Sequence, residues 1–120
     1  MPLAIHEFTL SEERLAFRNT LRRFFEESSP ITEVRRVMEG DSTGFAPDLW
    51  KVASEELGLA GIAISEDLGG QGFGLKELSI ALGEVGRSLA PIPLFASAAL
   101  AGRVVAAVGG EDADAFLRSI

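Results

Sequence analysis

The sequence has 120 residues, enough for one domain with a buried core, and a formal net charge of −7. Its 11 Lys and Arg residues are spread along the chain without a cluster, so nucleic acid is not expected as a partner. There is no cysteine, which excludes disulfide bonds and thiolate chemistry and fits a reducing compartment.

Residues 1–7 have no basic start and no long apolar run, so they do not read as a signal peptide. We therefore expect a cytoplasmic protein. His6 is the only histidine and has no second ligand near it in the sequence, so no metal site is predicted.

The first predicted helix begins at Thr9, because Thr9 and Glu12 have the spacing of a capping box. Its apolar face consists of Leu10, Phe17, Leu21, Phe24 and Phe25. Pro30 ends this helix or starts the next one. The stretch 31–38 is predicted to be a short second helix that Gly40 closes.

A third helix is predicted from Pro47, which suits the first helical position. Its inward stripe consists of Trp50, Ala53 and Leu57. Gly58 suits a left-handed stop at the end of this helix. The apolar stretch 59–64 is a strand or a loop, and its length does not separate the two.

The glycine-rich run 69–74 lacks both the dinucleotide-binding fingerprint and the lysine–hydroxyl pair of a P-loop. We expect it to be a tight turn with glycines at positive φ. The next helix begins at Leu75, and its opening amides could serve an anion. Its apolar positions are Leu75, Leu78, Leu82, Val85 and Leu89. Gly83 and Gly86 inside it indicate that another backbone or a ligand passes close by.

Pro91 and Pro93 predict a bend. The apolar stretch 94–108 after it predicts a helix buried on most sides, and Arg103 inside it argues against a membrane span. Small and apolar side chains around the bend would form a wall that suits an alkyl chain, although close packing between helices explains them as well. A last helix begins at Glu111, in an acidic first turn.

These elements predict an all-α antiparallel bundle of about six helices. With one histidine, no cysteine and no tyrosine, the usual nucleophiles and bases are scarce, and no catalytic residue is predicted. One interpretation is a non-catalytic helical interaction or regulatory module with a polar surface over its whole core. The apolar Ile120 on an unfinished helical face instead favours a piece of a longer protein.

Several short motifs, taken in order and spacing, resemble the N-terminal helical domain of the flavin-dependent acyl-CoA dehydrogenases. They are FTLSEE at 8–13, GFAPDLW at 44–50, ELG at 56–58, GGQG at 69–72, EVGR at 84–87 and FL at 116–117. The resemblance covers residues 8–120. Ser65 stands where the family often has a proline and Leu68 where it often has an aromatic residue, and both departures bear on the loop conformation.

The resemblance implies that the full-length protein is an enzyme that oxidises the α–β carbon bond of an acyl-CoA thioester with FAD as hydride acceptor. Residues 1–120 would be its N-terminal domain and one wall of the acyl pocket. The residues implied to bind substrate are Leu89, Pro91, Ile92, Leu94 and Ser97. A middle β domain and a C-terminal helical domain, absent from this chain, would hold most of the FAD.

The same resemblance implies partners for the chain. The missing domains, or a partner subunit, would complete the enzyme, and a homo- or hetero-oligomer is expected. The 120 residues alone are expected to be inactive and to hold no FAD tightly.

Overall fold

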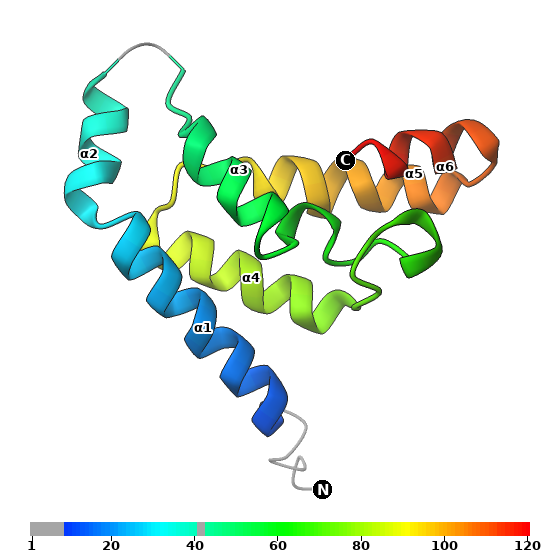
Figure 1. Ribbon diagram of the computed structural model, residues 1–120, viewed down its shortest axis with the longest axis horizontal. Coiled ribbons are helices and arrows are strands. Elements are labelled where there is room, and N and C mark those ends of the chain that lie inside the picture. The colour runs from blue at the N-terminus through cyan, green and yellow to red at the C-terminus, as the bar shows by residue number, and fades with distance from the viewer. Residues whose placement is uncertain (1–8, 41–42) are drawn as a thin grey trace, which may run out of the picture.

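A computed structural model describes residues 9–40 and 43–120, and all the regular structure in these ranges is helical (Figure 1). The α-helices are α1 (Glu12–Ser28), α2 (Ile31–Glu39), α3 (Pro47–Glu55), α4 (Leu75–Ser88), α5 (Gly102–Val108) and α6 (Glu111–Arg118). Two 3-10 turns, η2 (Leu59–Gly61) and η3 (Glu66–Leu68), lie between α3 and α4, and the π-helix η4 (Phe95–Ala101) runs into α5. The predicted all-α class is therefore confirmed. His6, the histidine considered for a metal site, lies outside the described residues.

The start of α1 differs from the prediction by a few residues. The cap is Ser11, which has extended backbone angles and accepts a hydrogen bond from the backbone amide of Arg14 at 3.2 Å. Thr9 was expected in this role, but Ser11 has the same chemistry and stands directly before the first helical residue. Of the predicted apolar face, Leu21 and Phe25 are almost fully buried, and Phe17 and Phe24 pack partly buried against the core. Leu10 lies before the first residue of the helix.

Helices α1 and α4 lie side by side and run parallel (Figure 1). Three ion pairs join them in the same order along both helices: Arg14–Glu77, Arg22–Glu84 and Glu26–Arg87. The predicted antiparallel arrangement therefore does not describe this pair. Helix α3, which lies between α1 and α4 in the sequence, runs in the opposite direction (Figure 1). It returns the chain to the end of the molecule where α1 begins, and α4 starts from there.

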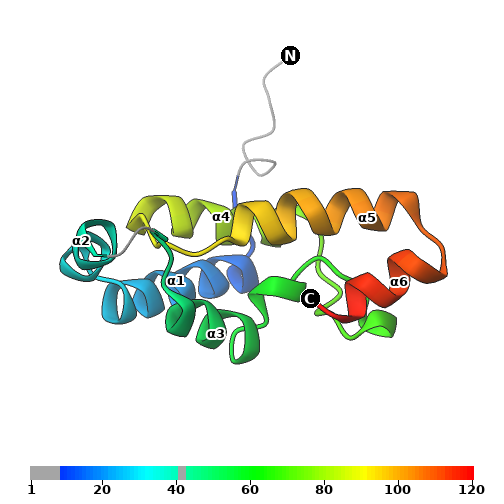
Figure 2. The same ribbon diagram turned by 90° about the horizontal axis from the view of Figure 1, so that it is seen from above.

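The core lies where α1, α3, α4, η2 and η4 meet, and the view in Figure 2 shows α4 and the η4–α5 run along one edge of the molecule. Its largest fully buried side chains are Leu21, Phe25, Leu59, Ile62 and Leu94. Ala53 is buried with Trp50 and Leu57 packed against the core, so the predicted stripe of α3 is confirmed. The stretch 59–64 forms no strand, because η2 and the turn after it take its place.

The helical run over 94–108 forms as predicted, but it is not buried on most sides. Its buried residues, Leu94, Ala98 and Gly102, make a single stripe at intervals of four. The opposite positions are exposed apolar side chains: Phe95, Leu100, Val104 and Val108. Among the described residues, α4, η2 and α6 cover one side of this run and leave the other open.

Three expectations for α4 and the turn before it have different outcomes. Gly58, Gly69 and Gly72 have positive φ, which confirms the predicted tight turns. Leu75 and Leu89 are about 60% exposed because they stand at the two ends of α4, so the predicted apolar stripe covers only the middle of the helix. A Cβ added at Gly83 or Gly86 would meet nothing within 4 Å, so no other backbone of the described chain passes there.

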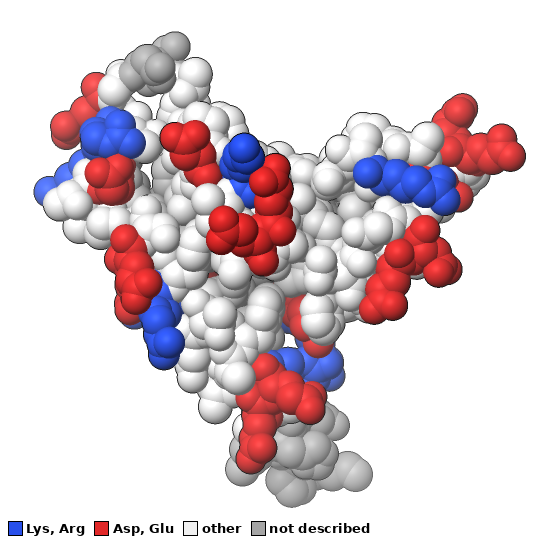
Figure 3. Space-filling view, viewed as in Figure 1, with Lys and Arg blue, Asp and Glu red and all other residues white. Residues whose placement is uncertain are grey.

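Charged side chains are scattered over the face shown in Figure 3, with the blue residues set singly or in small groups among the red ones. The broad uncharged area between them lies over the middle of the molecule (Figure 3). None of the helices in the described ranges is both long and apolar enough to cross a lipid bilayer.

Candidate functional site

The bend after α4 begins with a leucine in a strained conformation. Leu89 has φ 55°, and it is the only non-glycine residue in the described ranges with a positive φ. Two backbone bonds close the helix around it, from Leu89 N to Gly86 O at 3.2 Å and from Ala90 N to Val85 O at 3.1 Å. Glycine is the usual residue at this position, and a residue with a Cβ costs about 1–2 kcal/mol there. The strained residue carries a 61% exposed apolar side chain.

The five residues implied to bind substrate do not share one surface. Pro91 and Ile92 are half-buried and line an apolar hollow of about 450 Å³. Leu89 is exposed at the end of α4, and Ser97 is half-buried in η4. Leu94 is fully buried in the core, where it is not accessible from outside.

The loop before α3 forms the other side of this hollow. The amide of Ala46 donates to the carbonyl of Pro91 at 2.9 Å, which ties the loop to the bend. Gly44 and Phe45 then line the hollow opposite Ile92 and Pro93. Beyond the GFAP motif itself, no sequence pattern predicts this pairing, because the two segments are about 45 residues apart and no periodicity links them.

A π-helix follows the bend directly. In η4 the amide of Gly102 donates to the carbonyl of Ser97, five residues earlier. A Cβ added at Gly102 would come within 3.3 Å of that carbonyl oxygen, so a small residue suits the position. Because π-helical turns are rare and concentrate at functional sites, η4 adds a second unusual backbone feature beside Leu89.

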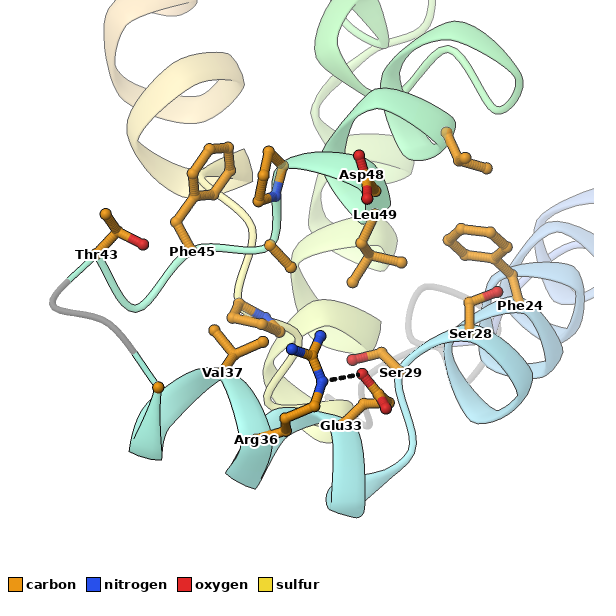
Figure 4. A pocket seen from close by; sticks show the side chains of 15 residues that line it. Phe24, Ser28, Ser29, Glu33, Arg36, Val37, Thr43, Phe45, Asp48 and Leu49 are labelled. Atoms are coloured by element: carbon orange, nitrogen blue, oxygen red, sulfur yellow. Dashed lines mark hydrogen bonds and ion pairs between the residues drawn. The ribbon is translucent and has the colours of Figure 1, made fainter.

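A larger hollow of about 770 Å³ also has Pro91 in its lining. It lies between the turn joining α1 to α2, the helix α2 and the start of α3 (Figure 4). Its apolar wall includes Phe24, Val37, Leu49 and Val52. Sequence reasoning missed this hollow, because its walls come from three elements whose relative positions the pattern does not set.

The glycine-rich turn before α4 holds no free cradle for a phosphate. The amides of Gln71, Gly72 and Phe73 donate to the chain's own carbonyls of Gly61, Ile64 and Ile62. At the start of α4 the carboxylate of Glu77 accepts from the amide of Gly74 at 3.2 Å and from Arg14 Nε at 2.9 Å. An internal carboxylate therefore occupies the place that was expected to be open to an anion.

The environment of Glu77 shifts its acidity. Burial alone would raise the pKa of this carboxyl, but hydrogen bonds from Arg14 and from the amides of Glu77 and Gly74 outweigh it. The pKa therefore lies below its ordinary value of 4.5, and the carboxylate form is favoured.

Glu84 is the most deeply buried charged group in the described ranges, with 4% of the residue exposed. Arg22 meets it with two hydrogen bonds, from Nη2 to Oε1 at 2.8 Å and from Nε to Oε2 at 3.2 Å. The hydrogen bond to Glu84 raises the pKa of Arg22 above its ordinary value. Both groups face each other between α1 and α4, so this pair serves the packing and is not aimed at a ligand.

Among residues 9–40 and 43–120, no group of three acidic, histidine or cysteine side chains is placed to hold a metal ion. The hollow beside η3 is lined by Glu66 and Asp67 together with Phe73 and other residues of the glycine-rich turn. The carboxylates of Glu66 and Asp67 are exposed to solvent, as most acidic side chains are.

Comparison with known proteins gives one family and two relatives. The family model described as "Acyl-CoA dehydrogenase, N-terminal domain" matches residues 11–116. The chain is 36% identical over 86 residues to acyl-CoA dehydrogenase IpdE2 of Mycolicibacterium smegmatis, which is 72% of this chain and 27% of that protein. It is 35% identical over 108 residues to acyl-CoA dehydrogenase IpdE2 of Mycobacterium tuberculosis, which is 90% of this chain and 33% of that protein. The chain thus spans a third or less of these relatives, and no solved structure matches significantly.

Proposed function

Because the chain belongs to the acyl-CoA dehydrogenase family as its N-terminal domain, we propose that it supplies one wall of the acyl pocket in a FAD-dependent enzyme. The enzyme would oxidise the α–β carbon bond of an acyl-CoA thioester. In this proposal the wall is the segment from Leu89 to Ser97, with Pro91 and Ile92 at its centre.

The apolar hollow beside Pro91 and Ile92 is the observation that carries the proposal. Its lining consists of Gly44, Phe45, Pro91, Ile92 and Pro93, none of which has a charged or hydroxylated side chain. An alkyl chain gains from burial against such a surface at about 25 cal/mol per Å² of apolar area. The strained and exposed Leu89 and the π-helix η4 flank the same bend, as backbone strain does at many binding sites.

The described residues do not fit FAD as its main binding site. The amides of the glycine-rich turn are taken up by the chain's own carbonyls, and Glu77 occupies the start of α4. We therefore assign the flavin contacts to parts of the enzyme outside these residues and derive no flavin step here. The purified chain should lose added FAD on desalting, as measured by absorbance near the flavin band, and retained flavin would contradict the assignment.

A non-catalytic interaction module is the alternative function. Such a module would cover its core with a polar surface, whereas Phe95, Leu100, Val104 and Val108 of this chain stand 50–77% exposed along one helical run. This exposed apolar run supports a domain that other parts of an enzyme cover. The relatives, which extend well beyond the matched region, support the same proposal.

The test is a bulky substitution in the assembled enzyme, that is, the chain together with the flavin-binding part that completes it. Ile92→Trp should narrow the hollow and shift the preferred acyl chain to shorter lengths, measured as kcat/KM over a series of acyl-CoA thioesters. Ile31→Trp is the matched control, because Ile31 is 51% exposed at the start of α2. An unchanged chain-length profile in Ile92→Trp would show that the bend does not line the acyl pocket.

A further inference from the structure

We propose that the hollow between α2 and α3 is a separate binding site for a small uncharged molecule with an apolar body and one hydrogen-bonding oxygen. The position of α2 creates the hollow. Val34, near the middle of α2, is the only buried residue of this helix, and Figure 1 shows α2 standing apart from α3. The space left between them, about 770 Å³, is within the usual range for sites that take small organic molecules.

The inner wall of the hollow is apolar. Phe24 from α1, Leu49 and Val52 from α3, and Pro91 from the bend all line it. Val37 faces them from α2 across the space (Figure 4). A molecule in this position would contact apolar side chains from four segments, which favours an aliphatic or alicyclic body.

Three hydroxyl-bearing residues, Ser28, Ser29 and Thr43, line the hollow, and Ser29 is the buried one. The residue as a whole is only 3% exposed. Figure 4 shows the hydroxyl oxygen directed into the space between α2 and α3. The fully buried side-chain polar atoms without a partner in the described ranges are Arg18 Nε and Ser54 Oγ, so the Ser29 hydroxyl oxygen is accessible from the hollow. A bound molecule with an oxygen atom could exchange a hydrogen bond with it.

The charges at the mouth argue against an ionic occupant. Arg36 is already paired with Glu33, from Nε to Oε2 at 2.8 Å, and Asp48 lines the opposite side. These three groups sum to one negative charge, so a carboxylate ligand would meet net repulsion. An ammonium ligand that packed against the apolar inner wall would lose hydration there. An alcohol or ketone meets neither penalty.

The experiment is an amide NMR titration of the 120-residue chain with three probes of equal length: hexan-1-ol, hexanoate and hexylammonium. Hexan-1-ol should give saturable shifts at Ser29, Val37, Leu49 and Val52, and the two ions should bind more weakly. No acyl-CoA or flavin is present, so the result is independent of the proposed enzyme function. Absent or non-saturable shifts, or tighter binding of either ion, would overturn the proposal.

Variants test the role of the hydroxyl. Ser29→Ala should weaken hexan-1-ol binding about fivefold, the effect of one hydrogen bond to a neutral partner. Ser79→Ala is the matched control, because the Ser79 hydroxyl bonds to the Leu75 carbonyl on the exposed side of α4. If Ser29→Ala disturbs folding, Val37→Trp fills the hollow from a half-exposed position of α2 and should abolish the saturable shifts. If Ser29→Ala and Val37→Trp both bound hexan-1-ol as tightly as the unmodified chain, the proposed site would be wrong.

Discussion

At the scale of single residues, Leu89 combines a conformational cost with an exposed apolar side chain. Leu89→Gly should relieve the left-handed strain and raise the free energy of unfolding by about 0.5–1 kcal/mol, after allowance for the greater freedom of glycine in the unfolded chain. Urea denaturation measures this. Leu15→Gly, at an exposed position inside α1, should instead lower the free energy of unfolding by about 1 kcal/mol. A loss of stability in both variants would show that Leu89 is not strained.

Glu84 should matter more to stability than any exposed acidic residue. Glu84→Gln keeps the shape of the side chain but removes the charge that faces Arg22, so the melting temperature should fall clearly. Glu33→Gln breaks the Glu33–Arg36 pair, whose side chains are 47% and 70% exposed, and should change the melting temperature little. Circular dichroism measures the two melting temperatures. Equal changes would show that the buried Glu84–Arg22 pair stabilises the fold no more than the exposed Glu33–Arg36 pair.

The lowered pKa of Glu77 predicts that the free energy of unfolding decreases at acidic pH. Its pKa in the folded state lies below the ordinary value of 4.5, so its contribution is present above that value and is lost as the pH falls through the lower folded-state pKa. Glu77→Gln should therefore make the loss of stability below about pH 4.5 less steep, as urea denaturation at a series of pH values would measure. An unchanged slope would show that the Arg14 and Gly74 contacts are not formed in solution.

At the scale of elements, α2 should be less protected than α4. It begins at Ile31, Pro30 before it provides no side-chain cap, and it buries only Val34, whereas α4 buries Leu78, Ala81 and Glu84. Amide hydrogen exchange should therefore be faster in α2 than in the middle of α4. Equal protection would mean that α2 is held by contacts other than those described.

The sequence predicted which stretches are helical better than how these helices pack. Caps and breakers are local, so Pro47, Gly58 and Gly69 could be read directly from the chain. Burial is not local, and an apolar run such as 94–108 does not show which of its sides a neighbour covers. For the same reason the parallel direction of α1 and α4 and the pairing of Phe45 with the bend became visible only in three dimensions.

The candidate site was predicted in part. The prolines marked the bend, and Pro91 and Ile92 do line an apolar hollow. Leu94, from the same short stretch, is fully buried, because it starts the helical run on the face that Ala98 and Gly102 continue toward the core. Whether any of the five contacts substrate stays a prediction for the assembled enzyme.

At the scale of the whole molecule, the exposed apolar run of η4 and α5 should make the isolated chain self-associate. Val104 and Val108 are 61% and 77% exposed, with Phe95 and Leu100 on the same run. Replacing both valines by lysine should lower the binding of a hydrophobic dye and shift sedimentation toward the monomer. Asn19→Lys with Thr20→Lys adds the same charge at exposed positions of α1 and should leave both measurements nearly unchanged.

The ion pairs between α1 and α4 have a consequence for how the chain is made. Arg22 and Glu84 are 62 residues apart in sequence, so α1 leaves the ribosome well before α4, its ion-pair partner, has been made. Early in synthesis its basic side chains face water, and closing this long loop is entropically slow. Deleting α1 would leave the buried Glu84 carboxylate without its Arg22 partner. The contact between α1 and α4 therefore forms late, and the finished fold depends on it.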